Sequence, residues 1–123
     1  MNEMGIKEDG KLCPKFMKTF EILGRKWNGL IIEVLLSNGP SRFKDLTGAV
    51  CTCSDRVLVE RLKELEEEGL VERRTYVDSA LIEYALTERG EAMRPLMDEI
   101  HRWADQTGSL SNDVDIEFLD SKS

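Results

Sequence analysis

The sequence has one histidine and three cysteines, and these small numbers already limit its chemistry. The single histidine, His101, leaves little from which to build a hydrolytic triad or a histidine-rich metal centre. An odd number of cysteines does not make a disulfide scaffold and is typical of a cytosolic protein with reactive thiols. Long apolar runs are missing too, because the longest one, residues 29–36, is interrupted by Glu33 and is far shorter than the ~20 residues of a membrane span. The N-terminus lacks the apolar stretch of an export signal, so we expect a cytoplasmic protein without a membrane association.

What the sequence does contain is enough apolar and charged residues for one folded domain. Its 123 residues are 41% hydrophobic and 33% charged, which is typical of a soluble globular protein. The net charge is −7, but residues 42–63 hold five basic and three acidic side chains, a local charge of +2. The acidity therefore weakens a role in binding nucleic acid without excluding it. We expect an N-terminal arm over residues 1–12, one domain over 13–106 and an acidic, flexible tail over 107–123.

Apolar periodicity and turn residues predict a mainly helical chain with one β-hairpin. The expected helices cover residues 14–23, 26–37, 42–50, 55–68 and 88–106, and the expected strands cover 71–76 and 81–86. This is the element order of a winged helix-turn-helix domain. The predicted fold class is α+β, mainly α, with N- and C-terminal dimerisation helices around that domain. Such domains also serve as protein-interaction modules, so the architecture alone does not fix the function.

The helix over residues 55–68 has the best specified ends. Ser54 can cap its N-terminus, and Gly69 suits the left-handed position just past its end, where Leu65 and Leu70 can make contact. Its faces differ: Leu58, Leu62 and Leu65 form an inward stripe, and Arg56, Val59, Glu60 and Lys63 point the other way. Ser41 and Thr87 are expected to cap the helices that follow them.

Several short motifs, in order and without gaps, connect the chain from Cys13 to about Trp103 with one family. They are Cys13-Pro14, Gly24-Arg25-Lys26-Trp27, Gly39-Pro40-Ser41-Arg42-Phe43 with Leu46, Ser54, residues 58–66, Gly69-Leu70-Val71 and residues 83–90. On these motifs the chain resembles the HxlR-type winged-helix regulators, relatives of the MarR group. The resemblance implies a bacterial cytoplasmic homodimer that binds double-stranded DNA at an operator and regulates transcription, more often as a repressor.

Two segments depart from the family pattern. Family members usually carry Pro-Pro-Arg or Pro-Pro-Lys at the wing tip, whereas this chain has Ser79-Ala80-Leu81 and lacks a basic residue there. Cys51, Thr52 and Cys53 stand where the family tends to have Pro-Gly-Ile before the recognition helix. The first departure puts the wing's share of DNA affinity in doubt, and the second makes the Cys-x-Cys pair unusual.

In a helix-turn-helix protein the second helix, here residues 55–68, enters the major groove while the first lies across the backbone. The residues expected to face bases are Ser54, Asp55, Arg56, Val59, Glu60 and Lys63. Those expected to neutralise phosphates are Arg42, Lys44, Arg61 and either Arg73 or Arg74. Arg56 can bind guanine through two hydrogen bonds, and Glu60 can accept one from cytosine. Arg61 borders the apolar stripe, so packing is its alternative role.

A long apolar face on the last helix indicates a surface for a second subunit. It comprises Met93, Leu96, Met97, Ile100 and Trp103, and we expect it to pack with Phe16, Met17 and Phe20 of the first helix. Two-fold symmetry then predicts a palindromic operator with half-sites about one helical turn apart. Trp27, Phe43 and Tyr84 are more simply core residues, and His101 is expected at the surface or the seam.

Cys13 is the candidate sensor. It precedes Pro14 at a helix N-terminus beside Lys11 and Lys15, and helix-end amides and ammonium groups favour the reactive thiolate. In the HxlR-type family a cysteine at this place commonly senses oxidants or electrophiles. The resemblance thus implies a switch by oxidation or alkylation of Cys13, with a thiol-reactive small molecule as inducer. A disulfide to Cys51 or Cys53 of the partner subunit can follow. In the simpler interpretation Cys13 is a partly buried small residue and Cys53 a core residue.

Two alternative functions stay open. Cys51 and Cys53 are similar to the thiolate pairs with which ArsR-type repressors sense soft metals or arsenite, and Cys13 can add a third sulfur. The other alternative is a winged-helix interaction module that does not bind DNA. An enzyme is not expected, because the sequence has no Cys-x-x-Cys, no suitable histidine partner and no glycine-rich cofactor loop. No cofactor and no resident metal are expected either.

Overall fold

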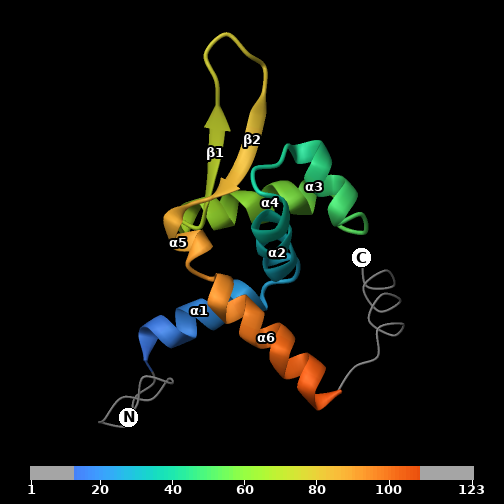
Figure 1. Cartoon of the computed structure of the whole chain (residues 1–123). Helices are drawn as coiled ribbons and strands as arrows, with labels where there is room; N and C mark the ends of the chain where they lie inside the picture. The colour runs from blue at the N-terminus through green and yellow to red at the C-terminus, as the bar shows by residue number, and fades with distance from the viewer. Residues whose placement is uncertain (1–12, 109–123) are drawn as a thin grey trace.

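The computed structural model describes residues 13–108, which form six helices and one two-stranded antiparallel sheet. In chain order these are α1 (Pro14–Gly24), α2 (Asn28–Asn38), α3 (Phe43–Ala49), α4 (Asp55–Glu67), β1 (Val71–Thr75), β2 (Ile82–Leu86), α5 (Glu88–Glu91) and α6 (Arg94–Thr107). The hairpin projects from one end of the molecule as the wing, and α1 and α6 lie at the other end (Figure 1). The mainly helical winged helix-turn-helix fold is confirmed. The predicted arm over 1–12 and residues 109–123 of the predicted tail lie outside the described residues.

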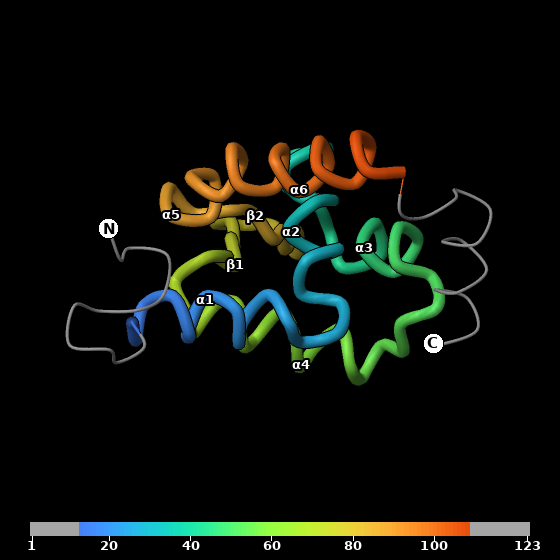
Figure 2. Tube along the Cα trace, turned by 90° about the horizontal axis from the view of Figure 1, so that it is seen from below, coloured from blue at the N-terminus to red at the C-terminus, as the bar shows by residue number. Residues whose placement is uncertain are grey.

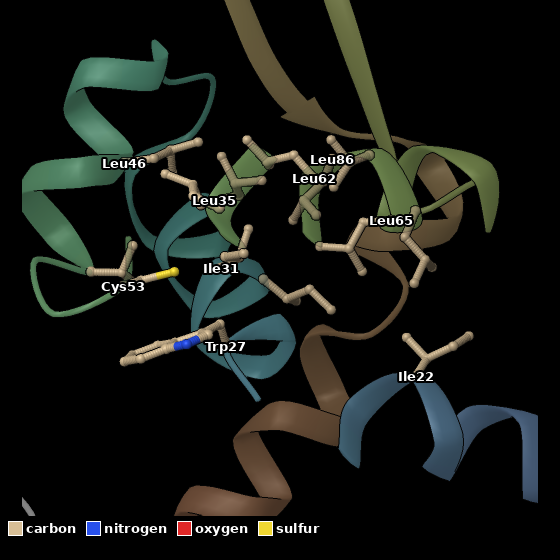
Figure 3. Close-up of a cluster of buried hydrophobic side chains, with 14 of the residues drawn as sticks. Ile22, Trp27, Ile31, Leu35, Leu46, Cys53, Leu62, Leu65 and Leu86 are labelled. Carbon is tan, nitrogen blue, oxygen red and sulfur yellow. The ribbon is translucent and has the colours of Figure 1, made fainter. Parts of the chain in front are cut away.

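Helix α2 forms the centre of the core. Its side chains Ile31, Ile32 and Leu35 are at most 1% exposed, and the helix contacts α1, α3, α4 and β2. The inward stripe of α4 packs in the same cluster, as the sequence predicts (Figure 3). The aromatic residues expected in the core lie in it or pack against it: Trp27, Phe43 and Tyr84. Each fully buried leucine or isoleucine contributes about 1.5–3 kcal/mol, so this cluster holds α4 and the wing in place.

Both ends of α4 form as the sequence predicts. The Ser54 hydroxyl accepts a hydrogen bond from the Val57 N–H at 3.2 Å, which satisfies one of the unpaired amides of the first turn. Gly69 has a left-handed backbone with φ +76°, and Leu70 N–H donates to the Leu65 carbonyl at 2.9 Å. This C-terminal motif turns the chain directly into β1.

The predicted Ser41 cap is wrong. Helix α3 begins at Phe43 with Arg42 as its N-cap, and the Arg42 N–H donates to the Asp45 carboxylate at 3.0 Å. Ser41 instead extends the sheet, because its N–H donates to the Tyr84 carbonyl at 2.9 Å and its carbonyl accepts from Tyr84 at 2.7 Å. This pair anchors the start of α3 to the base of the wing.

The predicted single helix after the wing is also wrong, since it divides into α5 and α6. Pro95 causes the break, because it has no N–H to donate to the Glu91 carbonyl and its ring crowds that carbonyl. Arg94, the first residue of α6, donates to the Leu36 carbonyl at 3.3 Å. Thr87 caps as predicted, with its hydroxyl accepting from the Gly90 N–H at 3.0 Å.

Helix α2 begins two residues later than predicted, at Asn28 instead of Lys26. The reason is Trp27, whose backbone is left-handed with φ +83° and therefore cannot continue a right-handed helix. A non-glycine residue is held in this conformation by its surroundings. Contacts around Trp27 therefore fix the junction between α1 and α2.

Candidate functional site

The outward face of α4 is polar and open to solvent. The residues expected to face bases are all exposed: Ser54, Asp55, Arg56, Val59, Glu60 and Lys63. They can be presented to a ligand because the opposite face of α4 is fixed in the core. Arg56 and Glu60 lie one turn apart, with Nη1 and Oε2 3.8 Å from each other. An exposed pair of this kind contributes less than about 1 kcal/mol, so separating it for base contacts costs little.

The expected phosphate contacts fall into two groups. Lys44 and Arg73 are exposed and make no ion pair with any residue between 13 and 108, and neither does Lys63, which is expected to face bases, so these charges are uncompensated. Arg42 and Arg74 are paired instead, with Asp45 at 3.7 Å and Glu72 at 2.7 Å. The uncompensated group is the better placed to attract a polyanion.

Arg61 has a different surrounding from the other predicted phosphate contacts. It is half-buried, and its Nε donates to the Lys26 carbonyl at 3.1 Å, across 35 residues of sequence. This hydrogen bond agrees with the alternative role in packing. It also fixes the peptide that precedes the left-handed Trp27.

The wing carries its basic residues on the strand and not at the tip. Arg73 lies opposite Tyr84 in the middle of the sheet. At the tip, Val77 is 91% exposed and Asp78 adopts a left-handed backbone with φ +61°. The tip is therefore apolar and acidic, in agreement with the missing basic residue near Leu81.

Cys13 is half-buried at the N-cap of α1 and lines an apolar groove of about 590 Å³. Helices α1 and α6 form this groove through Cys13, Lys15, Phe16, Thr19, Phe20, Leu23, Leu96 and Ile100. The structure thus brings the candidate sensor together with residues of the expected dimer surface. The neighbouring Lys11 lies outside the described residues.

Six of the eight residues expected at the dimer surface are exposed: Phe16, Met17, Phe20, Leu96, Ile100 and Trp103. The rings of Phe16 and Phe20 contact each other with centroids 4.9 Å apart. Met97, at 6% exposure, belongs to the core of the subunit, and Met93 packs against it. These two methionines hold α6 on its own subunit, which leaves the exposed six for a partner.

Cys51 and Cys53 differ sharply in accessibility. Cys51 is exposed in the turn before α4, whereas Cys53 is buried in the core beside Trp27 (Figure 3). Burial raises the pKa of the Cys53 thiol, against the smaller opposing effect of Arg61 and Lys26. Cys53 is thus the core residue of the simpler interpretation. Within residues 13–108, no three His, Cys, Asp or Glu side chains are arranged to hold a metal ion.

A polar cluster that joins α1, α2 and α4 is not among the features predicted from the sequence. Asn28 is 0% exposed, and its Nδ2 donates to the Ile22 carbonyl at 2.8 Å and to Glu64 Oε1 at 3.4 Å. The other carboxylate oxygen of Glu64 lies 3.5 Å from Arg25 Nη1. An asparagine beside an apolar run was the available signal, because a buried polar side chain needs partners.

Comparison with known proteins gives the family. A model of the HxlR-like helix-turn-helix family matches residues 22–112, most of the chain. The chain belongs to the HxlR-like helix-turn-helix family. Among its relatives is the HTH-type transcriptional regulator YodB of Bacillus subtilis, 45% identical over 96 residues, which are 77% of this chain and 85% of YodB. The predicted class, a helix-turn-helix transcriptional regulator, is confirmed.

Solved structures of similar proteins superpose well on this chain. The crystal structure of quinone-bound YodB from B. subtilis has a TM-score of 0.69 and 46% identity, covering 77% of this chain and 99% of that one. The redox regulator HypR in its reduced form has a TM-score of 0.70 and 27% identity, covering 77% and 94%. None of the described helices is long and apolar enough to cross a membrane.

Proposed function

We propose that this HxlR-like regulator is a homodimer that represses transcription from a palindromic operator and responds to oxidation or alkylation of Cys13. The observation that carries the proposal is the position of Cys13 in the apolar groove between α1 and α6. A modification there acts where two subunits meet and changes the spacing of their recognition helices. Binding to operator DNA places the regulator in the cytoplasm.

DNA recognition falls to the exposed face of α4. Arg56 has the geometry to bind guanine through two hydrogen bonds once it leaves Glu60, and Glu60 can then accept from cytosine. Lys44 and Arg73 neutralise phosphates, helped by Arg42 and Arg74, while Lys63 faces bases. The apolar wing tip contributes little to affinity, so most of the salt dependence comes from α3, α4 and β1.

The dimer is supported by the six exposed apolar residues of α1 and α6. Such a patch on a small protein marks an interaction surface. An isologous pairing about a two-fold axis buries it in both subunits at once. The two copies of α4 then read half-sites about 34 Å apart, which is one turn of B-DNA.

The switch uses ordinary thiolate chemistry. With a quinone, the electron pair of the Cys13 thiolate forms a C–S bond to a ring carbon, and the ring takes up a proton and becomes a hydroquinone. With diamide, Cys13 and a second thiol lose two electrons and two protons to the N=N bond, which becomes a hydrazine. Cys51 of the partner subunit is the better second thiol, because Cys53 is buried. The structures of quinone-bound YodB and of the redox regulator HypR, both similar to this chain, support this chemistry.

A mobility shift on the regulator's own promoter tests the proposal. Reduced protein, protein treated with a quinone or diamide, and the variants Cys13→Ser and Cys51→Ser are compared. We expect binding by the reduced wild type, loss of binding on treatment, and no response in Cys13→Ser. Cys51→Ser is the matched control and keeps the quinone response. Binding that ignores treatment contradicts the role of Cys13.

Salt dependence separates the regulator from a protein-interaction module. We expect operator affinity to fall steeply with salt, and Lys44→Ala to reduce the slope of log K against log salt by about 1. Arg102→Ala on α6, remote from α4, serves as the control and leaves the slope unchanged. If no duplex from the genome shows salt-dependent binding, the interaction-module alternative is correct.

A further inference from the structure

A second row of polar residues on α4 faces α1 and not the solvent side where DNA would bind. Arg61, Glu64 and Glu68 are spaced three and four residues apart, so they share one side of the helix and its C-terminal cap. Viewed from below, α1 runs over α4 (Figure 2). These three residues therefore lie on the side of α4 that faces α1, the helix whose N-cap is Cys13.

Each member of this row bonds to a different part of α1 or the junction after it. Glu68 Oε2 accepts from Lys18 Nζ of α1 at 3.1 Å. Glu64 accepts from Arg25 and from Asn28, at 3.5 and 3.4 Å. Arg61 donates to the Lys26 carbonyl at 3.1 Å. Three successive turns of α4 are thus bonded to the segment between Lys18 and Asn28.

Glu64 is the central member because its two oxygens bind two sides of the junction. Asn28 Nδ2, which it holds at Oε1, also donates to the Ile22 carbonyl in the last turn of α1. The carboxylate is therefore linked to the end of α1 through the side chain of Asn28 and is bonded directly to Arg25. A shift of α1 along its axis cannot leave these bonds unchanged.

The backbone of the junction makes it responsive to such a shift. Trp27 is left-handed, and the Lys26 ammonium lies 4.9 Å from the centre of its ring. A non-glycine residue keeps this conformation only while its neighbours enforce it. Arg61 of α4 is one of these neighbours, through the Lys26 carbonyl. A change in the junction therefore also disturbs its hydrogen bond to α4.

We propose that Glu64 is the positioning residue that transmits a displacement of α1, caused by modification of Cys13, to the recognition helix α4. The inference rests on the proposed function and adds the route between the thiol and the DNA-reading face. Glu64 and Arg25 belong neither to the groove that Cys13 lines nor to the residues expected to contact DNA. Their loss uncouples the two sites without removing either one.

The test measures operator affinity before and after quinone treatment, as a ratio, in wild type, Glu64→Ala and Arg25→Ala. In wild type we expect at least a tenfold loss of affinity on treatment. In both variants the loss shrinks to less than threefold, while the affinity of the reduced protein stays within about threefold of wild type. Arg25→Ala removes a partner of the carboxylate from the other side and serves as a second variant if Glu64→Ala fails to fold.

Glu67→Ala is the matched control, because Glu67 is exposed on the same turn of α4 and has no ion pair among the described residues. It keeps the wild-type ratio. Mass spectrometry confirms equal modification of Cys13 in every protein. A wild-type ratio in both Glu64→Ala and Arg25→Ala overturns the route through Glu64 and leaves the proposed function intact. Wild type that does not respond overturns the proposed function itself.

Discussion

Gly90 lies where the chain leaves the wing, and its position has no room for a side chain. A β-carbon there would clash with the Leu70 carbonyl oxygen and come within 2.9 Å of Leu86 Cδ2. We expect Gly90→Ala to lower the free energy of unfolding by about 2–3 kcal/mol, because backbone cannot move aside easily. Urea unfolding measures the change. Gly48→Ala is the control: nothing lies within 4 Å of its added carbon, and a helical alanine stabilises by roughly 0.5–1 kcal/mol. Equal effects of the two would contradict the steric argument.

His101 links α6 to α2 through Glu33, with Nε2 and Oε2 2.6 Å apart. The hydrogen bond and charge of Glu33 raise the pKa of His101, and Asp105 and Asp98 add to the effect. The stabilising contribution is therefore complete below the unfolded pKa of about 6.5 and is lost as pH rises through the higher folded pKa.

We expect wild type to lose more stability than His101→Gln between pH 6 and pH 9. Because the imidazole is largely exposed, the difference is small. Thermal unfolding across this range at low salt measures it, and Glu33→Gln should behave like His101→Gln. Parallel pH curves for wild type and both variants would show that the pair does not contribute.

At the scale of elements, the start of α4 depends on one side chain. Ser54→Ala removes the hydrogen bond to the Val57 N–H, and we expect a loss of about 1 kcal/mol in the free energy of unfolding. Ser54→Thr keeps the hydroxyl and should stay within a few tenths of wild type. Chemical denaturation compares the three proteins. A loss in Ser54→Thr as large as in Ser54→Ala would mean that the cap is not the cause.

Elements set by local chemistry could be predicted, and elements set by distant contacts could not. The N-cap of α4, its inward apolar stripe and the glycine that ends it depend on neighbours within a few residues, so the sequence predicts them. Pro95 was a local signal for the break between α5 and α6, but the apolar spacing continues across it and hid the break. Ser41 was missed because its partner, Tyr84, is 43 residues away.

The same distinction applies to the candidate site. The outward face of α4 follows from helical periodicity, so its residues could be named from the sequence. The burial of Met97 and the hydrogen-bond partner of Arg61 depend on which helices meet, which the sequence pattern does not give, whereas a core position for Cys53 was one of its predicted interpretations. The cluster around Asn28 and Glu64 joins residues 36 apart in the sequence, so the position of Asn28 beside an apolar run signals a buried polar side chain but not its partner.

At the scale of the whole molecule, the exposed side chains of α1 and α6 predict the oligomeric state. Ile100 is 48% exposed, and Ile100→Glu places a charge in the proposed dimer surface. We expect it to convert the dimer to a folded monomer and to weaken operator binding, since one half-site alone binds poorly. Sedimentation equilibrium and far-UV circular dichroism measure assembly and folding. Val77→Glu at the wing tip is the control and should remain a dimer. A dimeric Ile100→Glu would place the interface elsewhere.

The two tryptophans differ in exposure, so their fluorescence can report on two different parts of the molecule. Trp27 is 8% exposed in the core, and Trp103 is 61% exposed on α6. In the separated subunit their fluorescence should therefore differ, with Trp27 emitting at shorter wavelengths and Trp103 at longer ones, and burial in the dimer should move the Trp103 emission to shorter wavelengths. In a Trp27→Phe protein the remaining emission reports only on α6, and in a Trp103→Phe protein it reports only on the turn beside α4. Subunit association and movement of the turn beside α4 can thus be followed separately by intrinsic fluorescence, without any attached dye.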